Sequence, residues 1–397
     1  MDNQLTTKAN QLLEFFASYE SDNYSDLSLV QGKIGLLLLS SISSAPTTLL
    51  SKADSVVFLE DIFDELARKP VGNSYASGLA GLGWVIEYMV AKEVIDADTN
   101  ELLEEVDAIL YDWMLEEQHR KNYDFLHGSM GVGLYFLSRI NSNPLAKEKV
   151  SKLLDLLIEA AVVEQDGSTK WEQGWDTFPE HEPVYNLGLA HGIPSILVFL
   201  VKSFQKNICR EKLYPIIQST TSYILKQHQA FDLRQFHFPH AIIGKRTYSE
   251  SRMAWCYGDL GVCCALWQAN QVLRDERVAD TISDILHNNA TRRDPQQCMI
   301  TDASFCHGSA GAAYIFRRFY DRLGYPELLD ASRYWYKKTL ELANHPDGYV
   351  DYKFWAGDRS EWENRLGLLD GLAGVALSLL YAGNRVDASW DEVLLIS

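Results

Sequence analysis

The chain has 397 residues, and its composition excludes several classes of protein. Hydrophobic residues make up 47% of it, so a large core is available and extended disorder is excluded. The 54 acidic residues outnumber the 36 basic ones, which gives a net charge of −18 and argues against nucleic acids and anionic membranes as partners. This charge is compatible with a neutral or cationic peptide substrate.

The N-terminal stretch MDNQLTTKANQLLEFF lacks the basic region and apolar core of a secretion signal. No run of about 20 apolar residues occurs, so we expect a cytoplasmic protein without a membrane span. In that compartment cysteines stay reduced, which favours metal binding or burial over disulfides. The six cysteines stand at positions 209, 256, 263, 264, 298 and 306.

Seven copies of one unit follow one another along the chain. Each has a charged segment of helical period, then a G-x-x-G motif and an apolar run. The charged segments lie at 4–20, 54–67, 100–117, 147–163, 210–228, 275–290 and 326–344. The motifs begin at Gly32, Gly78, Gly128, Gly192, Gly258, Gly308 and Gly371. The fourth motif departs from the pattern, with Pro194 and Ser195 where its second glycine is expected.

This alternation of charged and apolar helices predicts an all-α fold, an α/α toroid in which seven outer helices ring seven inner ones. We expect one domain over residues 1–397. The alternative is an open solenoid, but strongly apolar inner helices without a polar capping repeat favour closure. The two longest intervals, 163–187 and 229–250, are rich in aromatic residues, histidine and proline, and we expect ordered loops suited to binding there.

Aligning the repeats on the first glycine brings two cysteines to one position, two residues before that glycine. Cys256 and Cys306 therefore occupy equivalent sites in adjacent repeats, and we expect them to be neighbours. With His307 they offer the ligands of a catalytic zinc site that keeps one position open. Cys306 and His307 can share an ion only in the loop before the helix, because consecutive side chains diverge on a helix.

The alternative for this cluster is that both cysteines are small buried hydrophobes and that His307 caps its helix. For the other four cysteines we expect burial without a ligand role. The position just before the glycine is polar in every repeat, and its occupants are Gln31, Ser77, His127, His191, Tyr257, His307 and Asp370. We interpret His127, Ser77 and Asp370 as lining residues or caps.

The segments YDFLHGSMG, LAHGIPS, SRMAWCYGDLG and FCHGSAG resemble the lanthionine synthetase C-like (LanC-like) cyclases of lanthipeptide biosynthesis. The resemblance covers all seven repeats. It implies an α/α toroid that binds one zinc ion per chain through Cys256, Cys306 and His307. It also implies that four further residues match the active site of the family: Asp124, His191, Arg252 and Tyr257.

The activity that the resemblance implies is zinc-dependent ring closure. A peptide cysteine thiol adds to dehydroalanine or dehydrobutyrine in the same peptide, in an intramolecular Michael-type addition that forms (methyl)lanthionine. His191 is the candidate general acid. Asp124 would orient an imidazole or take the thiol proton, while Arg252 and Tyr257 would stabilise the enolate oxygen. The alternatives from the residues alone are that Asp124 and Arg252 form a structural ion pair and that His191 caps its helix.

The implied partner is a dehydrated precursor peptide, with leader and core. No interval between motifs has room for a sizeable inserted domain, so we expect a stand-alone cyclase that works beside a separate dehydratase and a peptide exporter, at the membrane periphery. One alternative is a non-catalytic toroid that binds zinc and a thiol such as glutathione, and needs no proton donor at His191. A glycosidase-type barrel would need paired carboxylates at matched ring positions, which the alignment does not offer.

Overall fold

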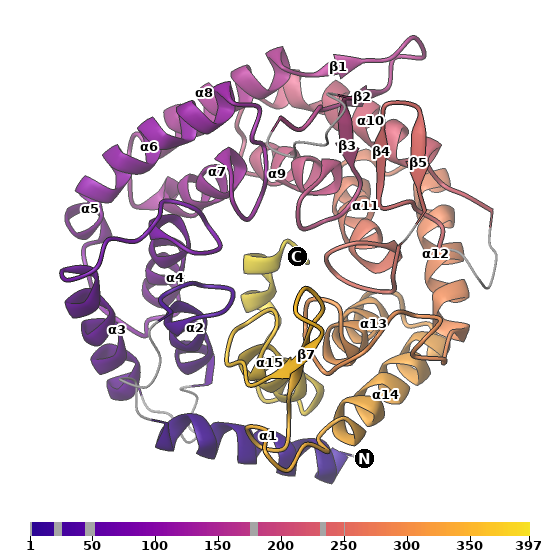
Figure 1. The fold of residues 1–397 in the computed structure, drawn as a ribbon. Helices are drawn as coiled ribbons and strands as arrows, with labels where there is room; N and C mark the ends of the chain where they lie inside the picture. The colour runs from indigo at the N-terminus through magenta and orange to yellow at the C-terminus, as the bar shows by residue number, and fades with distance from the viewer. Residues whose placement is uncertain (1, 20–25, 44–51, 175–181, 231–235, 250) are drawn as a thin grey trace. The chain divides into compact units, whose positions relative to one another are not determined.

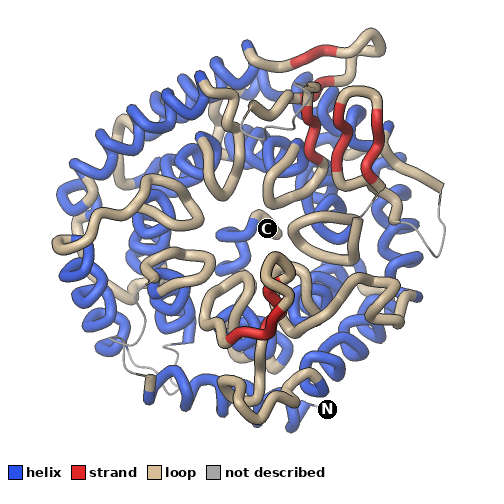
Figure 2. The backbone as a smooth tube through the Cα atoms, in the orientation of Figure 1, coloured by secondary structure: helices blue, strands red, loops and turns tan. Residues whose placement is uncertain are grey.

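The computed structural model describes all residues except 1, 20–25, 44–51, 175–181, 231–235 and 250. The described chain is mostly helical, with a few short strands (Figures 1 and 2). It forms two compact units, each made of separate stretches. Unit 1 comprises Met1–Gly72, Tyr88–Ala97 and Ala290–Asp391, and unit 2 comprises Asn73–Glu87, Asp98–Asn289 and Glu392–Ser397.

The seven charged segments form helices, as the sequence predicts, although the fourth ends at Glu159 and residues 162–163 form a strand instead. They are α1 (Asp2–Ser18), α3 (Lys52–Leu66), α6 (Glu104–His119), α8 (Ala146–Glu159), α10 (Arg210–Lys226), α12 (Glu276–Thr291) and α14 (Pro326–Glu341). The third segment differs at its start, where a separate helix α5 (Thr99–Leu102) precedes α6. Asp98 caps α5 by accepting hydrogen bonds from two backbone N–H groups, and Leu103 then leaves helical geometry before α6 begins.

The apolar runs also form helices, and the first glycine of the motif is the N-cap in the last five repeats. These helices are α2 (Lys33–Ser43), α4 (Leu79–Ala91), α7 (Ser129–Ser138), α9 (Ile193–Gln205), α11 (Asp259–Leu273), α13 (Ser309–Leu323) and α15 (Leu372–Ala382). In α7 and α15 every residue up to the last turn is buried, as expected for helices that are apolar on all sides. Among the described helices, none is long and apolar enough to cross a membrane.

Unit 1 joins the first repeat to the last. Helix α15 of the seventh repeat packs against α2 of the first repeat and against α13 of the sixth. The backbone N–H of Leu369, in the last motif loop, also donates a hydrogen bond to the carbonyl of Val30, in the first (3.0 Å). The terminal repeats of an open solenoid would lie apart, so this contact contradicts the solenoid alternative.

In unit 2 the apolar helices again pack in repeat order, α7 against α9 and α9 against α11. The two long intervals meet in a small antiparallel sheet, in which β3 (Val184–Asn186) pairs with β4 (Ala241–Ile243), and β4 with β5 (Arg246–Tyr248). These parts of the two intervals are ordered, as expected, but they form strands rather than loops. Residues 175–181, 231–235 and 250 of the same intervals lie outside the described chain. The other described strands form two antiparallel hairpins. In one, β1 (Val162–Val163) pairs with β2 (Thr169–Lys170), and in the other, β6 (Phe354–Ala356) pairs with β7 (Glu361–Glu363).

A buried ion network ties three helices of unit 2 together. Arg139 begins the 3-10 helix η2 (Arg139–Asn141) that follows α7, and its side chain is 0% exposed. Its guanidinium lies 2.6 Å from a carboxylate oxygen of Asp107 on α6 and 2.6 Å from one of Glu87 on α4. A buried pair of this kind is costly to break, because the remaining partners keep their charge without compensation.

We expect Arg139→Leu to lower the free energy of unfolding by about 3–5 kcal/mol, since it leaves two buried carboxylates without their cation. Urea denaturation of the purified protein measures this change. The matched control is Arg277→Leu, because Arg277 pairs with Asp275 at the surface with 87% of its side chain exposed, and we expect it to change stability little. Equal stability of the two variants would contradict a structural role for the network.

Candidate active site

The loops that precede the apolar helices are linked by backbone hydrogen bonds between equivalent residues. In each of four cases, the residue two places before the first glycine of one repeat donates its N–H to the carbonyl of its equivalent in a neighbouring repeat. The pairs are Ala76 to Leu126, Ala190 to Cys256, Cys306 to Leu369, and Leu369 to Val30, at 2.8–3.2 Å. The repeat alignment is therefore confirmed at the position that carries both cysteines.

In unit 1, Cys306 and His307 lie in the turn before α13, whose N-cap is Gly308. The prediction that this pair lies outside the helix is confirmed. The Nδ1 atom of His307 is 3.8 Å from a carboxylate oxygen of Asp370, the equivalent residue of the next repeat. A carboxylate beside a histidine ligand commonly fixes its ring orientation and raises its basicity as a ligand. Asp370 therefore lies where a carboxylate can act on the ring of His307.

In unit 2, two glycines shape the loop that carries Cys256. Gly258 has a φ of 113°, and a Cβ atom there would lie 1.7 Å from the carbonyl oxygen of Arg252. A Cβ at Gly188 would lie 2.6 Å from the carbonyl oxygen of Cys256 and 2.4 Å from the ring of Tyr257. Only glycine fits at either position, because side chains would push the loop away from its neighbours.

Cys306 and His307, adjacent in unit 1, offer a thiolate and an imidazole to a metal ion, and Cys256 offers a second thiolate from the equivalent loop of unit 2. Two thiolates and one imidazole are a donor set that suits zinc. The residues therefore fit the ion that the sequence predicts.

The remaining cysteines lack the character of ligands. Burial raises the pKa of the Cys263 thiol well above its usual range and that of Cys298 to about 12, so both thiols stay protonated. Cys264 is also buried, as expected. The expectation of burial is wrong for Cys209, which is half-buried at the start of α10.

His191 and Asp124 form a hydrogen-bonded pair in unit 2, with 2.7 Å between His191 Nδ1 and Asp124 Oδ2. Asp124 is fully buried, and its other oxygen accepts a hydrogen bond from the backbone N–H of His127 (2.6 Å). A carboxylate only accepts hydrogen bonds, so the pair places a proton on Nδ1 of His191 and leaves Nε2 as the atom for proton exchange. The N-cap residue of α9 is Gly192, which has no side chain for capping.

Asp124 has both oxygens engaged, which suits it to orienting His191 rather than to taking a proton from substrate. Arg252 is half-buried, and in the described residues it makes no ion pair with Asp124. The structural ion pair considered from the sequence is therefore not formed. The backbone of Arg252 packs closely against Gly258 in the loop that carries Cys256. In the same loop, Met253 forms an isolated antiparallel β-bridge with Gly258.

His127 stacks on His191, with ring centroids 6.0 Å apart and an interplanar angle of 12°. Burial lowers the pKa of His127, although the Asp124 carboxylate partly offsets this. His127 is therefore neutral near pH 7, which makes it a poor proton donor beside His191.

Tyr257 also lies beside His191, with 5.8 Å between the ring centroids. Its hydroxyl accepts a hydrogen bond from the side-chain amide of Asn186 (3.2 Å), and the ring of His240 lies 4.2 Å from its own. The sequence analysis missed Asn186 and His240. Neither belongs to a repeat motif, and only the pairing of β3 with β4 brings them beside Tyr257.

Comparison with known proteins shows the family and the fold of the chain. A family model described as "Lanthionine synthetase C-like protein" matches residues 25–395. The structure is similar to that of nisin cyclase, with a TM-score of 0.71, 18% identity, and coverage of 99% of this chain and 97% of that chain. The likeness shows the fold, and the predicted all-α, α/α toroid is confirmed.

Two other solved structures are less similar. A cellobiose 2-epimerase from Bacillus thermoamylovorans has a TM-score of 0.47 and 12% identity, and the match covers 97% of this chain and 100% of that one. A GH76 α-mannanase from Bacteroides thetaiotaomicron has a TM-score of 0.45 and 8% identity, with 96% of each chain covered. No curated protein sequence is a significant match.

Proposed function

The chain belongs to the lanthionine synthetase C-like family, and from that premise we propose that it is a lanthipeptide cyclase. It would close thioether rings in a dehydrated precursor peptide. The observation that carries the proposal is the pair of His191 and the fully buried Asp124. A protein that only binds a thiol needs no oriented imidazole for proton exchange, whereas an enzyme that protonates a carbon does.

The proposed reaction balances without a further reactant. The peptide thiol loses its proton, and its sulfur forms a bond to the β-carbon of dehydroalanine or dehydrobutyrine. The electron pair of the C=C bond moves to give an enolate, whose α-carbon then takes up a proton. The product is (methyl)lanthionine, and no leaving group is released.

We propose that Cys256, Cys306 and His307 hold one zinc ion per chain, because two thiols and one imidazole suit zinc and both cysteines occupy the same position of the repeat. Bound zinc lowers the pKa of a coordinating thiol, so that the thiolate is present near neutral pH. Asp370 would orient His307 from 3.8 Å away, in the manner of a carboxylate behind a histidine ligand.

His191 would deliver the proton to the α-carbon through Nε2, while Asp124 holds Nδ1 and stabilises the imidazolium form before transfer. Tyr257, held by Asn186, would donate its hydroxyl hydrogen to the developing enolate oxygen. Arg252 would supply positive charge for the same oxygen, since it is half-buried and not paired with Asp124. We further propose a separate dehydratase and a peptide exporter as the partners before and after this step.

The test is the initial rate of ring closure on a synthetic peptide that carries one dehydroalanine and one cysteine. Thiol alkylation followed by mass spectrometry separates closed from open peptide. We expect zinc-loaded protein to raise the rate well above that of the spontaneous reaction, and to direct it to one stereoisomer. Protein that binds zinc and glutathione but leaves the rate and the isomer ratio unchanged, with this peptide and with a dehydrated precursor encoded beside its gene, would favour the non-catalytic adaptor instead.

A further inference from the structure

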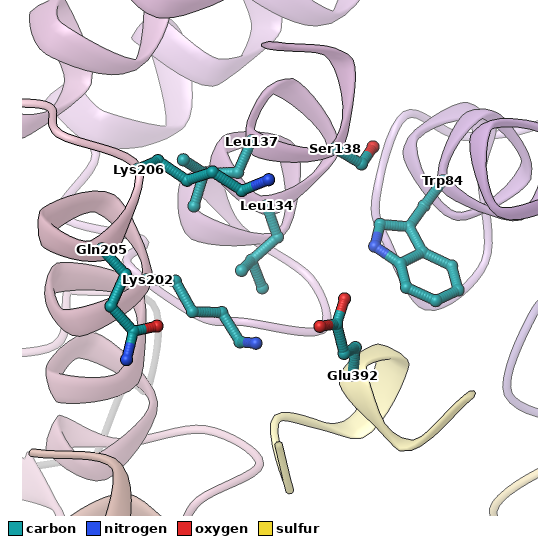
Figure 3. A pocket seen from close by; sticks show the side chains of 8 residues that line it. All are labelled: Trp84, Leu134, Leu137, Ser138, Lys202, Gln205, Lys206 and Glu392. Atoms are coloured by element: carbon teal, nitrogen blue, oxygen red, sulfur yellow. The ribbon is translucent and has the colours of Figure 1, made fainter. Parts of the chain in front are cut away.

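One pocket of unit 2, with a volume of about 370 Å³, lies away from His191 (Figure 3). Its lining includes the apolar side chains of Trp84, Leu134 and Leu137 and the opposite charges of Lys206 and Glu392. The pocket contacts the last turns of α7 and α9, whereas His127 and His191 lie just before the first turns of these helices. Because α7 alone is about 15 Å long, the side chains that contact His191 and Tyr257 come from the other ends of the helices.

A second pair of an imidazole and a buried carboxylate lies in unit 2, with 2.8 Å between His237 Nδ1 and Asp259 Oδ2. His237 is 1% exposed and Asp259 is 0% exposed. The carboxylate of Asp259 also accepts hydrogen bonds from the backbone N–H groups of His237 (3.0 Å) and Phe238 (3.2 Å), and from the side-chain amide of Asn289 (2.8 Å). A buried carboxylate with so many donors is held firmly, because its release would leave both the charge and the donors without partners.

This pair joins two segments of the chain that meet again at Tyr257. Asp259 is the first residue of α11 and follows Tyr257 by two positions. His237 precedes His240 by three positions, and His240 lies directly before β4. The ring of His240 in turn lies 4.2 Å from the ring of Tyr257. The contacts therefore form a closed circuit, in which the buried pair fixes the segment that brings His240 to Tyr257.

The same strand pairing also brings a partner to the hydroxyl of Tyr257. Asn186 of β3 lies opposite Ala241 of β4, and the backbone N–H of Leu187 donates a hydrogen bond to the carbonyl of His240 (3.0 Å). The side-chain amide of Asn186 donates to the hydroxyl of Tyr257, which keeps its own hydrogen for another acceptor. His240 contacts the ring and Asn186 the hydroxyl, so together they set the direction in which Tyr257 can donate.

We propose that His240 is a positioning residue for Tyr257, and that the buried pair of His237 and Asp259 holds His240 in place. This inference rests on the proposed function, in which the hydroxyl of Tyr257 donates its hydrogen to the enolate oxygen. Such a donor is most effective when it is already aimed at the oxygen where charge develops. His240 restricts the rotation of the Tyr257 ring by packing against it and transfers no proton.

The first experiment measures the initial rate of ring closure by zinc-loaded protein. His240→Ala removes the packing ring, and we expect a rate about 10–100-fold lower, the scale of loss that a misplacement of about 1 Å causes. His240→Phe restores a flat ring and should recover most of this rate. The control His119→Ala, at an exposed position of α6, should leave the rate unchanged.

A double variant tests whether His240 acts through Tyr257. In protein that carries Tyr257→Phe, the further change His240→Ala should alter the rate by less than about threefold, because the hydroxyl that His240 positions is already absent. A residue that only stabilised the fold would give the same loss with and without this hydroxyl. An unchanged rate in His240→Ala, no recovery in His240→Phe, or additive losses in the double variant would overturn the proposal.

The second experiment needs no ring closure, so it separates this proposal from the proposed function. In protein isotopically labelled at the Cε1 atom of histidine, the aromatic ring of Tyr257 should displace the NMR signal of His240, which is assigned by its loss in His240→Phe. Tyr257→Leu should move this signal toward that of a free histidine. Asp259→Asn should do the same, since asparagine has one acceptor oxygen for the donors that two oxygens of Asp259 hold.

A His240 signal that neither Tyr257→Leu nor Asp259→Asn moves would overturn the positioning role. Wild-type protein that shows the displaced signal but closes no rings would contradict the proposed function, while supporting the contact by which His240 positions Tyr257.

Discussion

His191→Asn should retain zinc and fold normally but lose most ring closure, with an initial rate about 10²–10⁴-fold below that of the wild type. The asparagine amide can still donate a hydrogen bond to Asp124, so the buried carboxylate keeps a partner. It has no group that gives up a proton near neutral pH, and the enolate carbon would then depend on water. Initial rates and the ring isomer formed must both be compared, because dehydrated peptides also cyclise slowly without enzyme.

His127→Asn is the matched control, because His127 occupies the equivalent position of the preceding repeat and stacks on His191. Since burial holds His127 neutral, we expect its loss to change the rate by less than about tenfold. If both variants lost the same fraction of the ring-closure rate, the two imidazoles would contribute only through packing and not through proton transfer. A normal rate in His191→Asn would remove His191 from the role of proton donor without contradicting zinc binding.

Cys306→Ala should lose zinc and ring closure together. Two of the three protein ligands would remain, and we expect zinc affinity to fall by more than about 100-fold, beyond the 10–100-fold typical of losing a residue behind a ligand. Elemental analysis of protein purified without chelator gives the metal content, and a competition titration with a chromophoric chelator gives the affinity. Circular dichroism checks that the helices persist.

Cys263→Ala is the control for this prediction, because Cys263 is equally a buried thiol in a neighbouring apolar segment but has a strongly raised pKa. We expect it to keep one zinc per chain and to lose only a little stability from the small cavity. Cys306→Ala protein that still holds stoichiometric zinc, or wild-type protein that is folded and active without metal, would contradict the proposed centre.

The sequence alone predicted the helices of the seven repeats and the equivalence of the two cysteines, but not the short strands. Helical period and the glycine motif predicted each outer and inner helix, because amphipathic and fully apolar helices need different surroundings and so differ in pattern. The alignment placed Cys256 and Cys306 at one repeat position, and the backbone bonds of that position, such as Ala190 to Cys256, confirm it. The break between α5 and α6 was missed, because it falls at Leu103, an apolar residue that continues the helical pattern of the sequence.

Contacts between residues far apart in sequence were decided only by the tertiary structure. Asp124 engages His191 rather than Arg252, because the loops before α7 and α9 are adjacent and the buried carboxylate takes the donors that they supply. Asn186 and His240 reach Tyr257 through strand pairing that leaves no periodic trace in the sequence. The pocket over Trp84 lies where three helices and the segment around Glu392 converge. Repeated motifs predict the helices and loop positions that all seven repeats share. The chemistry of a site depends instead on side chains that occur once and that packing brings together.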